Sequence, residues 1–354
     1  MKPETIDCGD INIMINKSST IKERIDRWNA FRALDPSVKH INLINYGQGA
    51  PKQPHLWPSK KKERVDFIVN SFHFQSEEAE WLDDDKIPHL NFLSGTEIFA
   101  EAFGSKIHRA EDNMPFALPV VQNASDASKL KIPDLFNSTL AFQFELADEV
   151  IAKSGKQITR LPDIQSPMDI AALIWEKTDF YIAMIEEPEA VKELAAEVRV
   201  LLTAFLDEWF KRYGTSYIAH YPHYYMEGGM TLSEDEIGAV STGMYDEFFL
   251  PELEYLSNRY GGIGIHCCAN SRHQWDGFLK IPNLKLINLI QPADIIAEAY
   301  PIFHGICPQW HYYSTISAPF YEIEKQFPDT HLVLETTAAS KDEAIKLAEY
   351  LKML

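Results

Sequence analysis

A histidine and a cysteine that could share a metal ion end an apolar, glycine-led segment of the chain. His266 and Cys268 follow the Ile-rich run 263–265, which predicts a buried strand. Residues i and i+2 of a strand point to the same face, so both side chains can reach one point, whereas Cys267 faces away. Imidazole and thiolate are ligands that zinc prefers. The pair predicts a metal site, in an enzyme that acts on a thiol or a methyl group. The alternative is structural: a buried cysteine beside a hydrogen-bonded histidine.

Regular alternation of apolar and amphipathic runs predicts the elements that position this pair. Strands are expected over 217–226, 263–268, 284–290, 302–306 and 331–335. Helices are expected over 244–259, 274–279, 295–299, 319–326 and 341–353. Such alternation favours βαβ units and a parallel sheet. The number of units makes a closed (β/α)8 TIM barrel the leading fold, with a doubly wound sheet as the alternative. No glycine-rich phosphate fingerprint follows a strand, which argues against a dinucleotide-binding protein.

The first half of the chain is less regular, and we predict a single domain over residues 1–354. A helix is expected over 21–34 and a first strand over 42–46. The N-terminal part, about 20–115, is interpreted as helical segments that extend over the barrel mouth. Residues 168–214 are expected to be mostly helical, with a break where Pro188 suits the first turn of a new helix.

In a barrel the carboxyl ends of the strands form one face, which carries the active site. His266 and Cys268 end one predicted strand, Cys307 follows another, and Glu335 ends the last. We therefore expect these side chains to converge although they are far apart in sequence. Further candidates for contact with a substrate follow other predicted strands: His220, His223, Tyr224 and Asn123. For each of these four, packing or hydrogen bonding inside the protein is the alternative role.

The composition narrows the classes of partner. The net charge of −19 argues against nucleic acid and anionic membrane surfaces, because both require basic patches. No run of 18 apolar residues predicts a membrane span, and the first residues have no apolar signal core. Four cysteines, two of them adjacent, make a poor disulfide framework. We therefore expect a cytoplasmic protein.

Several segments resemble the uroporphyrinogen decarboxylase superfamily. The segment 163–171 (DIQSPMDIA) is similar to its "GP-x-T-x-A" turn, and 187–194 (EPEAVKEL) resembles its "dPe-x-v-x-x-L" helix start. The segment 244–251 (MYDEFFLP) resembles its "M-Y-x-x-F-x-x-P" helix, and 265–270 (IHCCAN) its "iH-x-CGn" strand end. These matches keep their order over roughly residues 20–354. The resemblance implies a TIM-barrel fold.

The superfamily has two main branches, and the motifs point to one of them. Uroporphyrinogen decarboxylases need no metal and carry an N-terminal "P-x-W-x-M-R-Q-A-G-R" signature that this chain lacks. Arg24, Arg27 and Arg32 lie instead on a predicted helix, where solvation of the helix surface explains them as well as substrate binding does. The other branch, cobalamin-dependent methyltransferases, uses His-x-Cys and a distant Cys to hold zinc. The resemblance implies that His266 and Cys268 are catalytic zinc ligands.

The same resemblance implies a cofactor, a partner and a reaction. Zinc would activate a small-molecule thiol, which takes a methyl group from a corrinoid. Because the chain lacks the Asp-x-His-x-x-Gly signature of a corrinoid-binding domain, cobalamin would be carried by a separate corrinoid protein. The last predicted strand contains no Cys, so Glu335 and Cys307 remain alternative third metal ligands. A metal-free enzyme acting on a tetrapyrrole and a non-catalytic docking module for a corrinoid protein are the competing functions.

Overall fold

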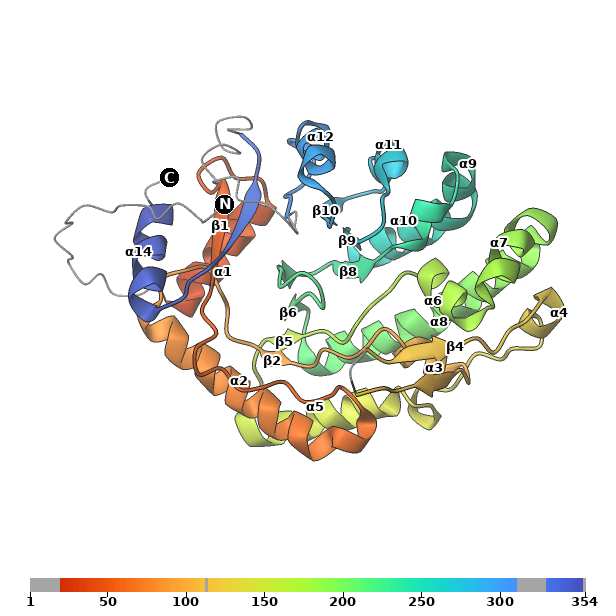
Figure 1. Ribbon diagram of the computed structural model, residues 1–354, viewed down its shortest axis with the longest axis horizontal. Helices are drawn as coiled ribbons and strands as arrows, with labels where there is room; N and C mark the ends of the chain where they lie inside the picture. The colour runs from red at the N-terminus through yellow and green to blue at the C-terminus, as the bar shows by residue number, and fades with distance from the viewer. Residues whose placement is uncertain (1–19, 112–113, 311–328, 353–354) are drawn as a thin grey trace.

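Short strands alternate with helices along the chain, and the helices lie outside the strands (Figure 1). The computed structural model describes residues 20–111, 114–310 and 329–352. The predicted helix over 319–326 lies outside these residues. Within them, no helix is both long and apolar enough to cross a lipid bilayer. The α/β class predicted from the sequence is confirmed.

Eight strands pair in parallel with a neighbour. They are β1 (His40–Asn45), β2 (Leu90–Asn91), β5 (Thr159–Arg160), β6 (Ser216–Ile218), β8 (Met230–Ser233), β9 (Ile263–Cys267), β10 (Leu284–Leu289) and β11 (Leu332–Thr337). The parallel ladders are β1–β11, β2–β5–β6 and β8–β9–β10. Two further strands, β3 (Lys106–His108) and β4 (Phe116–Leu118), form an antiparallel hairpin.

Isolated parallel bridges connect these ladders. Gln309 bridges Ile287 of β10 and Leu332 of β11, and Gln165 bridges Ser233 of β8. Pairing therefore runs from β8 through β9, β10 and Gln309 to β11 and β1. In the described part of the chain no ladder joins β1 to β2. The pairing shows a mostly parallel α/β architecture but does not show a closed barrel.

The longer helices pack around the strands. They are α1 (Ile21–Arg32), α2 (Lys61–Trp81), α5 (Ala141–Ser154), α6 (Pro167–Ile174), α7 (Lys177–Glu186), α8 (Pro188–Tyr213), α10 (Leu250–Tyr260), α12 (Ala293–Phe303) and α14 (Lys341–Leu351). Shorter helices are α3 (Ile98–Ala102), α4 (Ala124–Ala127), α9 (Thr242–Met244) and α11 (Trp275–Phe278).

Local sequence signals explain where several helices begin. Thr20 and Glu23 form a reciprocal capping box at the start of α1. Trp28 and Phe31 then bury one side of this helix in the main core. The predicted break before α8 is present, with Pro188 in its first turn, where a missing amide hydrogen costs nothing.

Two predicted strands differ from the structure. Residues 217–226 are not one strand: β6 ends at Ile218, and β7 (Tyr225–Glu227) returns antiparallel to it. Pro222, which has no backbone N–H to donate to a ladder, lies in the loop between them. Residues 302–306 are not a strand either, because α12 continues to Phe303. Cys307 therefore follows a helix and lies before the Gln309 bridge, not at the carboxyl end of a strand.

Two glycines connect α10 to β9. Gly261 adopts a left-handed conformation as the C-cap of α10. Gly262 has φ +134°, and a Cβ there would lie 2.6 Å from the carbonyl oxygen of Asn283. Only glycine fits this close approach without strain. The turn sends the chain directly into β9, which contains His266 and ends one residue before Cys268.

Candidate active site

The end of β9 brings an imidazole and a thiol into contact. His266 Nε2 lies 3.0 Å from Cys268 Sγ. His266 is 6% exposed, whereas Cys268 is exposed, so the pair is open on the cysteine side. Cys267 is buried, and its Sγ lies 3.5 Å from the carbonyl oxygen of Ala269. The two-residue spacing therefore places a nitrogen and a sulfur donor side by side.

Asn288, on the neighbouring strand β10, orients the imidazole. Its Oδ1 is hydrogen bonded to His266 Nδ1, and its Nδ2 donates to the carbonyl oxygen of Trp310. The second bond fixes Oδ1 as the acceptor, so Nδ1 carries the proton. The lone pair of Nε2 then faces Cys268. This is the arrangement by which a hydrogen-bonded partner orients a metal-binding histidine.

The half-buried Asp235 contacts the backbone of Cys268, and the buried carboxyl groups of Asp169 and Glu234 adjoin Asp235. Asp235 Oδ1 accepts the backbone N–H of Cys268 at 2.5 Å. Asp169 accepts the backbone N–H groups of Asp235 and Glu236 at 2.8 and 2.9 Å. Burial raises the pKa of Asp169 to about 7, and burial beside Asp169 raises the pKa of Glu234 well above its ordinary value. Burial, followed by the charge of Asp235, raises the pKa of the Cys268 thiol to about 12. Burial and the Asp235 charge therefore disfavour a thiolate at Cys268 unless a cation lies beside it.

The loop after β6 contacts both the His–Cys pair and a nearby cavity. The ring of Tyr221 packs edge-on against His266, with ring centroids 4.4 Å apart. His220 is completely buried, and its Nε2 lies 2.9 Å from Ser233 Oγ. Tyr224 is also completely buried and packs against Trp28, with centroids 5.0 Å apart. The contacts of His220 and Tyr224 are those of core residues.

His223, from the same loop, lines a cavity of about 230 Å³. The lining comes from α1, α2, the segment 84–91, the ends of β1 and β6, and β11. Burial lowers the pKa of His223 well below its ordinary value. His223 nevertheless keeps a large accessible surface, because the cavity lies beside it. Glu335 lines this same cavity, and its Oε1 accepts a hydrogen bond from Asn45 Nδ2 at 2.7 Å.

Other predicted site residues lie apart from the His–Cys pair. Asn123 is the exposed N-cap of α4, and its side chain accepts from the backbone N–H of Asp126. Cys307 is buried, and burial raises the pKa of its thiol. Across residues 20–111, 114–310 and 329–352, no three His, Cys, Asp or Glu side chains are grouped so that they could hold a metal ion. Neither Glu335 nor Cys307 therefore lies where it could share a metal ion with His266 and Cys268.

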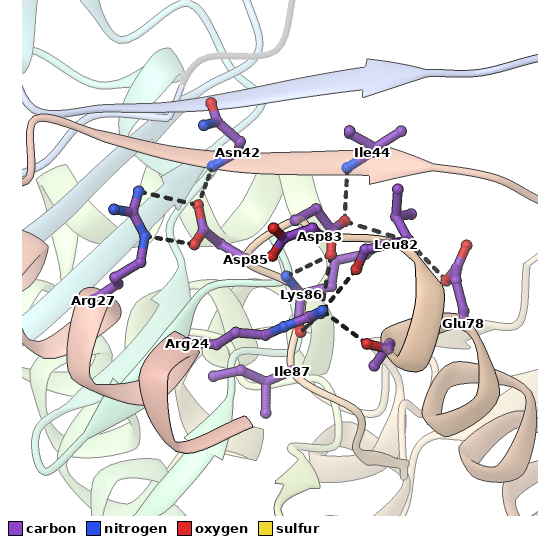
Figure 2. A network of polar contacts seen from close by, with 12 residues as sticks. Arg24, Arg27, Asn42, Ile44, Glu78, Leu82, Asp83, Asp85, Lys86 and Ile87 are labelled. Atoms are coloured by element: carbon purple, nitrogen blue, oxygen red, sulfur yellow. Dashed lines mark hydrogen bonds and ion pairs between the residues drawn. The ribbon is translucent and has the colours of Figure 1, made fainter. Parts of the chain in front are cut away.

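The arginines of α1 have structural partners (Figure 2). Arg24 is completely buried, forms an ion pair with Asp84 at 3.1 Å and donates to three backbone carbonyl oxygens. Arg27 pairs with Asp85 at 2.8 Å. Arg32 donates to the carbonyl oxygen of Glu227. Of the two explanations that the sequence left open, surface solvation does not apply to Arg24, because its side chain is completely buried. Its guanidinium instead holds the segment after α2 against α1.

Sequence reasoning missed Asn288, Asp235 and Tyr221. One signal was available: Asn288 interrupts the apolar run 284–290, and a polar residue in a buried strand usually has a specific partner. Asp235 lay in an acidic run that is typical of a solvated loop. Nothing local indicated that Tyr221 would contact His266.

The fold and the site define an α/β protein with an imidazole and a thiol in contact at the carboxyl end of a buried parallel strand. Residues 90–309 match the family described as uroporphyrinogen decarboxylase (URO-D). The match covers more than half of the chain, and the chain belongs to this family. The family indicated by the sequence motifs is thus confirmed.

A solved structure is similar over nearly the whole length. It is a methyltransferase from Methanosarcina mazei, with a TM-score of 0.61 and 10% sequence identity. The alignment covers 95% of this chain and 99% of that protein. At this identity the likeness shows a shared fold. A comparison with curated proteins finds no match.

Proposed function

We propose that the protein is a methyltransferase in which His266 and Cys268 hold a zinc ion. The reaction moves a methyl group from a corrinoid, carried by a separate protein, to the sulfur of a thiol acceptor. The main support for the proposal is the distance of 3.0 Å between His266 Nε2 and Cys268 Sγ. The family membership and the similarity in fold to a methyltransferase support it.

The chemistry of the donor set suits zinc. One nitrogen and one sulfur are adjacent, and Asn288 keeps the lone pair of His266 Nε2 available. The Asp235 carboxylate beside Cys268 favours a divalent cation. Within the described residues we assign His266 and Cys268 as zinc ligands. Glu335 and Cys307 are not assigned as ligands. Residues 311–328 lie outside the described part of the chain.

Each of the residues that contact His266 or Cys268 has a defined role. A bound zinc ion would supply Lewis acidity that lowers the pKa of a coordinated thiol. Asn288 holds the Nδ1 proton of His266, and the ring of Tyr221 excludes water from one side of the imidazole. Asp235 fixes the backbone at Cys268, so the sulfur keeps its place at the end of β9.

We further infer that the eight parallel-paired strands are those of a (β/α)8 barrel. Support comes from the Gln309 bridges, which join β10 to β11, and from the helices that lie outside the strands. His266 and Cys268 then lie on the face where barrel enzymes place their active sites.

A metal-free enzyme acting on a tetrapyrrole has less support. Its substrate carries many carboxylates, which require free cationic groups. Arg24 is buried and paired with Asp84, and Arg27 is paired with Asp85. The cavity of about 230 Å³ is below the roughly 300–1,000 Å³ typical of pockets for drug-sized ligands.

Zinc stoichiometry, measured by elemental analysis of freshly purified protein, tests the proposal. We expect about one zinc per native chain and a strong loss in both His266→Ala and Cys268→Ala. The matched control is Cys267→Ala, which removes the neighbouring thiol and should keep the metal. Cys307→Ala and Glu335→Gln should also keep it.

The other results have distinct meanings. No zinc in the native chain, even after zinc is supplied, would overturn the metal mechanism. A stoichiometry well below one would favour a non-catalytic docking protein. If zinc is bound, methyl transfer from methylcobalamin to a small thiol should be detected in the native chain and lost in the Cys268→Ala variant.

A further inference from the structure

The cavity beside His223 has an excess of negative charge. Two cations and two carboxylates in its lining pair with one another: Arg24 with Asp84 at 3.1 Å, and Lys86 with Glu78 at 2.9 Å. Figure 2 shows Arg24 and Lys86 within the polar network beneath α1. One further carboxylate remains, that of Glu335. Within the described residues Glu335 accepts a hydrogen bond from the neutral amide of Asn45, and it forms no ion pair.

Arg160, a cation outside the cavity lining, does not offset the negative charge of Glu335. The charge of Arg160 contributes to the low pKa of His223. Its guanidinium donates to the carbonyl oxygen of His220 and interacts electrostatically with Asp163. Arg160 is therefore directed to the loop backbone and to a buried acid rather than to Glu335.

Two imidazoles line the cavity, and that of His89 offers a hydrogen-bond acceptor. His89 Nδ1 lies 2.9 Å from the carbonyl oxygen of Ile87, so Nδ1 carries the proton and Nε2 is an acceptor. Burial lowers the pKa of His89 to about 4, which keeps the ring neutral at pH 7. The His223 ring, 5.9 Å from His89 between centroids, is neutral for the same reason. No hydrogen bond within the described residues engages His223.

These features specify one class of ligand. We infer that the cavity binds a small organic ammonium compound, with its positive charge against Glu335 and its N–H or O–H groups toward His89 and His223. The volume equals that of about eight liquid waters, which restricts the ligand to a small molecule. Trp28 and Phe74 also line the cavity and provide aromatic surface that tolerates alkylated cations. Neither His266 nor Cys268 lines the cavity, and the inference goes beyond the proposed function.

Calorimetric titration with choline tests the inference. The neutral comparison is the isosteric alcohol in which carbon replaces the ammonium nitrogen. We expect choline to bind the native chain at least tenfold more tightly than this alcohol. We expect Glu335→Gln to weaken choline binding at least tenfold, because it removes the charge and keeps the shape. Glu193→Gln, on the exposed surface of α8, is the matched control and should bind as the native chain does.

Three results would overturn the inference: no binding of choline, equal binding of the neutral alcohol, or unchanged binding in a folded Glu335→Gln variant. The comparison of choline with the alcohol on the native chain decides the question even if that variant does not fold. Choline binding should be retained in His266→Ala, which separates this site from the zinc proposal. Loss of zinc without loss of choline binding would leave the cavity assignment intact.

Discussion

His266 and Asn288 lie opposite each other in the parallel register of β9 and β10, and their side chains are hydrogen bonded. Register partners on neighbouring strands project from the same face, which is why the bond forms. The bond places the proton on Nδ1 and leaves Nε2 directed at Cys268. The orientation of the candidate metal ligand is therefore decided by the pairing of two strands.

Removal of this bond should weaken metal binding. Asn288→Leu keeps the approximate shape of the side chain but removes the acceptor for His266 Nδ1. Loss of such a partner typically costs about 10–100-fold in metal affinity. We expect that decrease for zinc, measured by competition with a chelator of known affinity.

Asn288→Asp is the companion variant, because it keeps an acceptor oxygen at the same place. It should retain tighter zinc binding than Asn288→Leu. Equal affinities in the native chain and Asn288→Leu would show that the bond does not orient the ligand.

The buried ion pair between Arg24 and Asp84 should contribute strongly to folding (Figure 2). Arg24→Met leaves the Asp84 carboxylate buried without its guanidinium partner. Breaking such a pair from one side costs about 3–5 kcal/mol. We expect this decrease in the free energy of unfolding, measured by urea denaturation.

The double variant Arg24→Met with Asp84→Leu should recover part of the loss, since neither charge then remains buried. Arg27→Met should have a smaller effect, because the Arg27 side chain is 43% exposed. A double variant less stable than Arg24→Met would contradict this explanation.

Stability should fall in mild acid, in part through His89. Burial lowers the pKa of His89 from 6.5 in the unfolded chain to about 4 in the folded protein. Between these values the unfolded state binds a proton that the folded state does not, so stability falls as pH decreases from about 6.5 to about 4. One pKa unit corresponds to about 1.4 kcal/mol, so the loss from His89 by pH 4.5, about two units below 6.5, is on the order of 2–3 kcal/mol.

Urea denaturation at pH 7 and at pH 4.5 measures this loss. His89→Gln should reduce the difference in unfolding free energy between the two pH values. His73→Gln, which removes an exposed histidine of α2, is the control. The same pH dependence in the native chain and His89→Gln would exclude His89 as a source.

The sequence by itself determined the local features of the protein. Apolar periodicity indicated the strand that ends at His266 and the helices around it, and the two-residue spacing placed Cys268 on the same face. Motif order indicated the family. These properties depend on residues close together in the chain, whose geometry is set by backbone dihedral angles alone.

Only the tertiary structure decided which distant residues meet. Asn288 reaches His266 through the register of two strands, and Glu335 lies in the cavity beside His223 rather than with Cys268. Cys307 follows α12 because that helix extends beyond the predicted boundary. Strand register and helix length arise from the packing of the whole core. A one-residue shift in either changes which side chains meet, so local patterns do not specify these contacts.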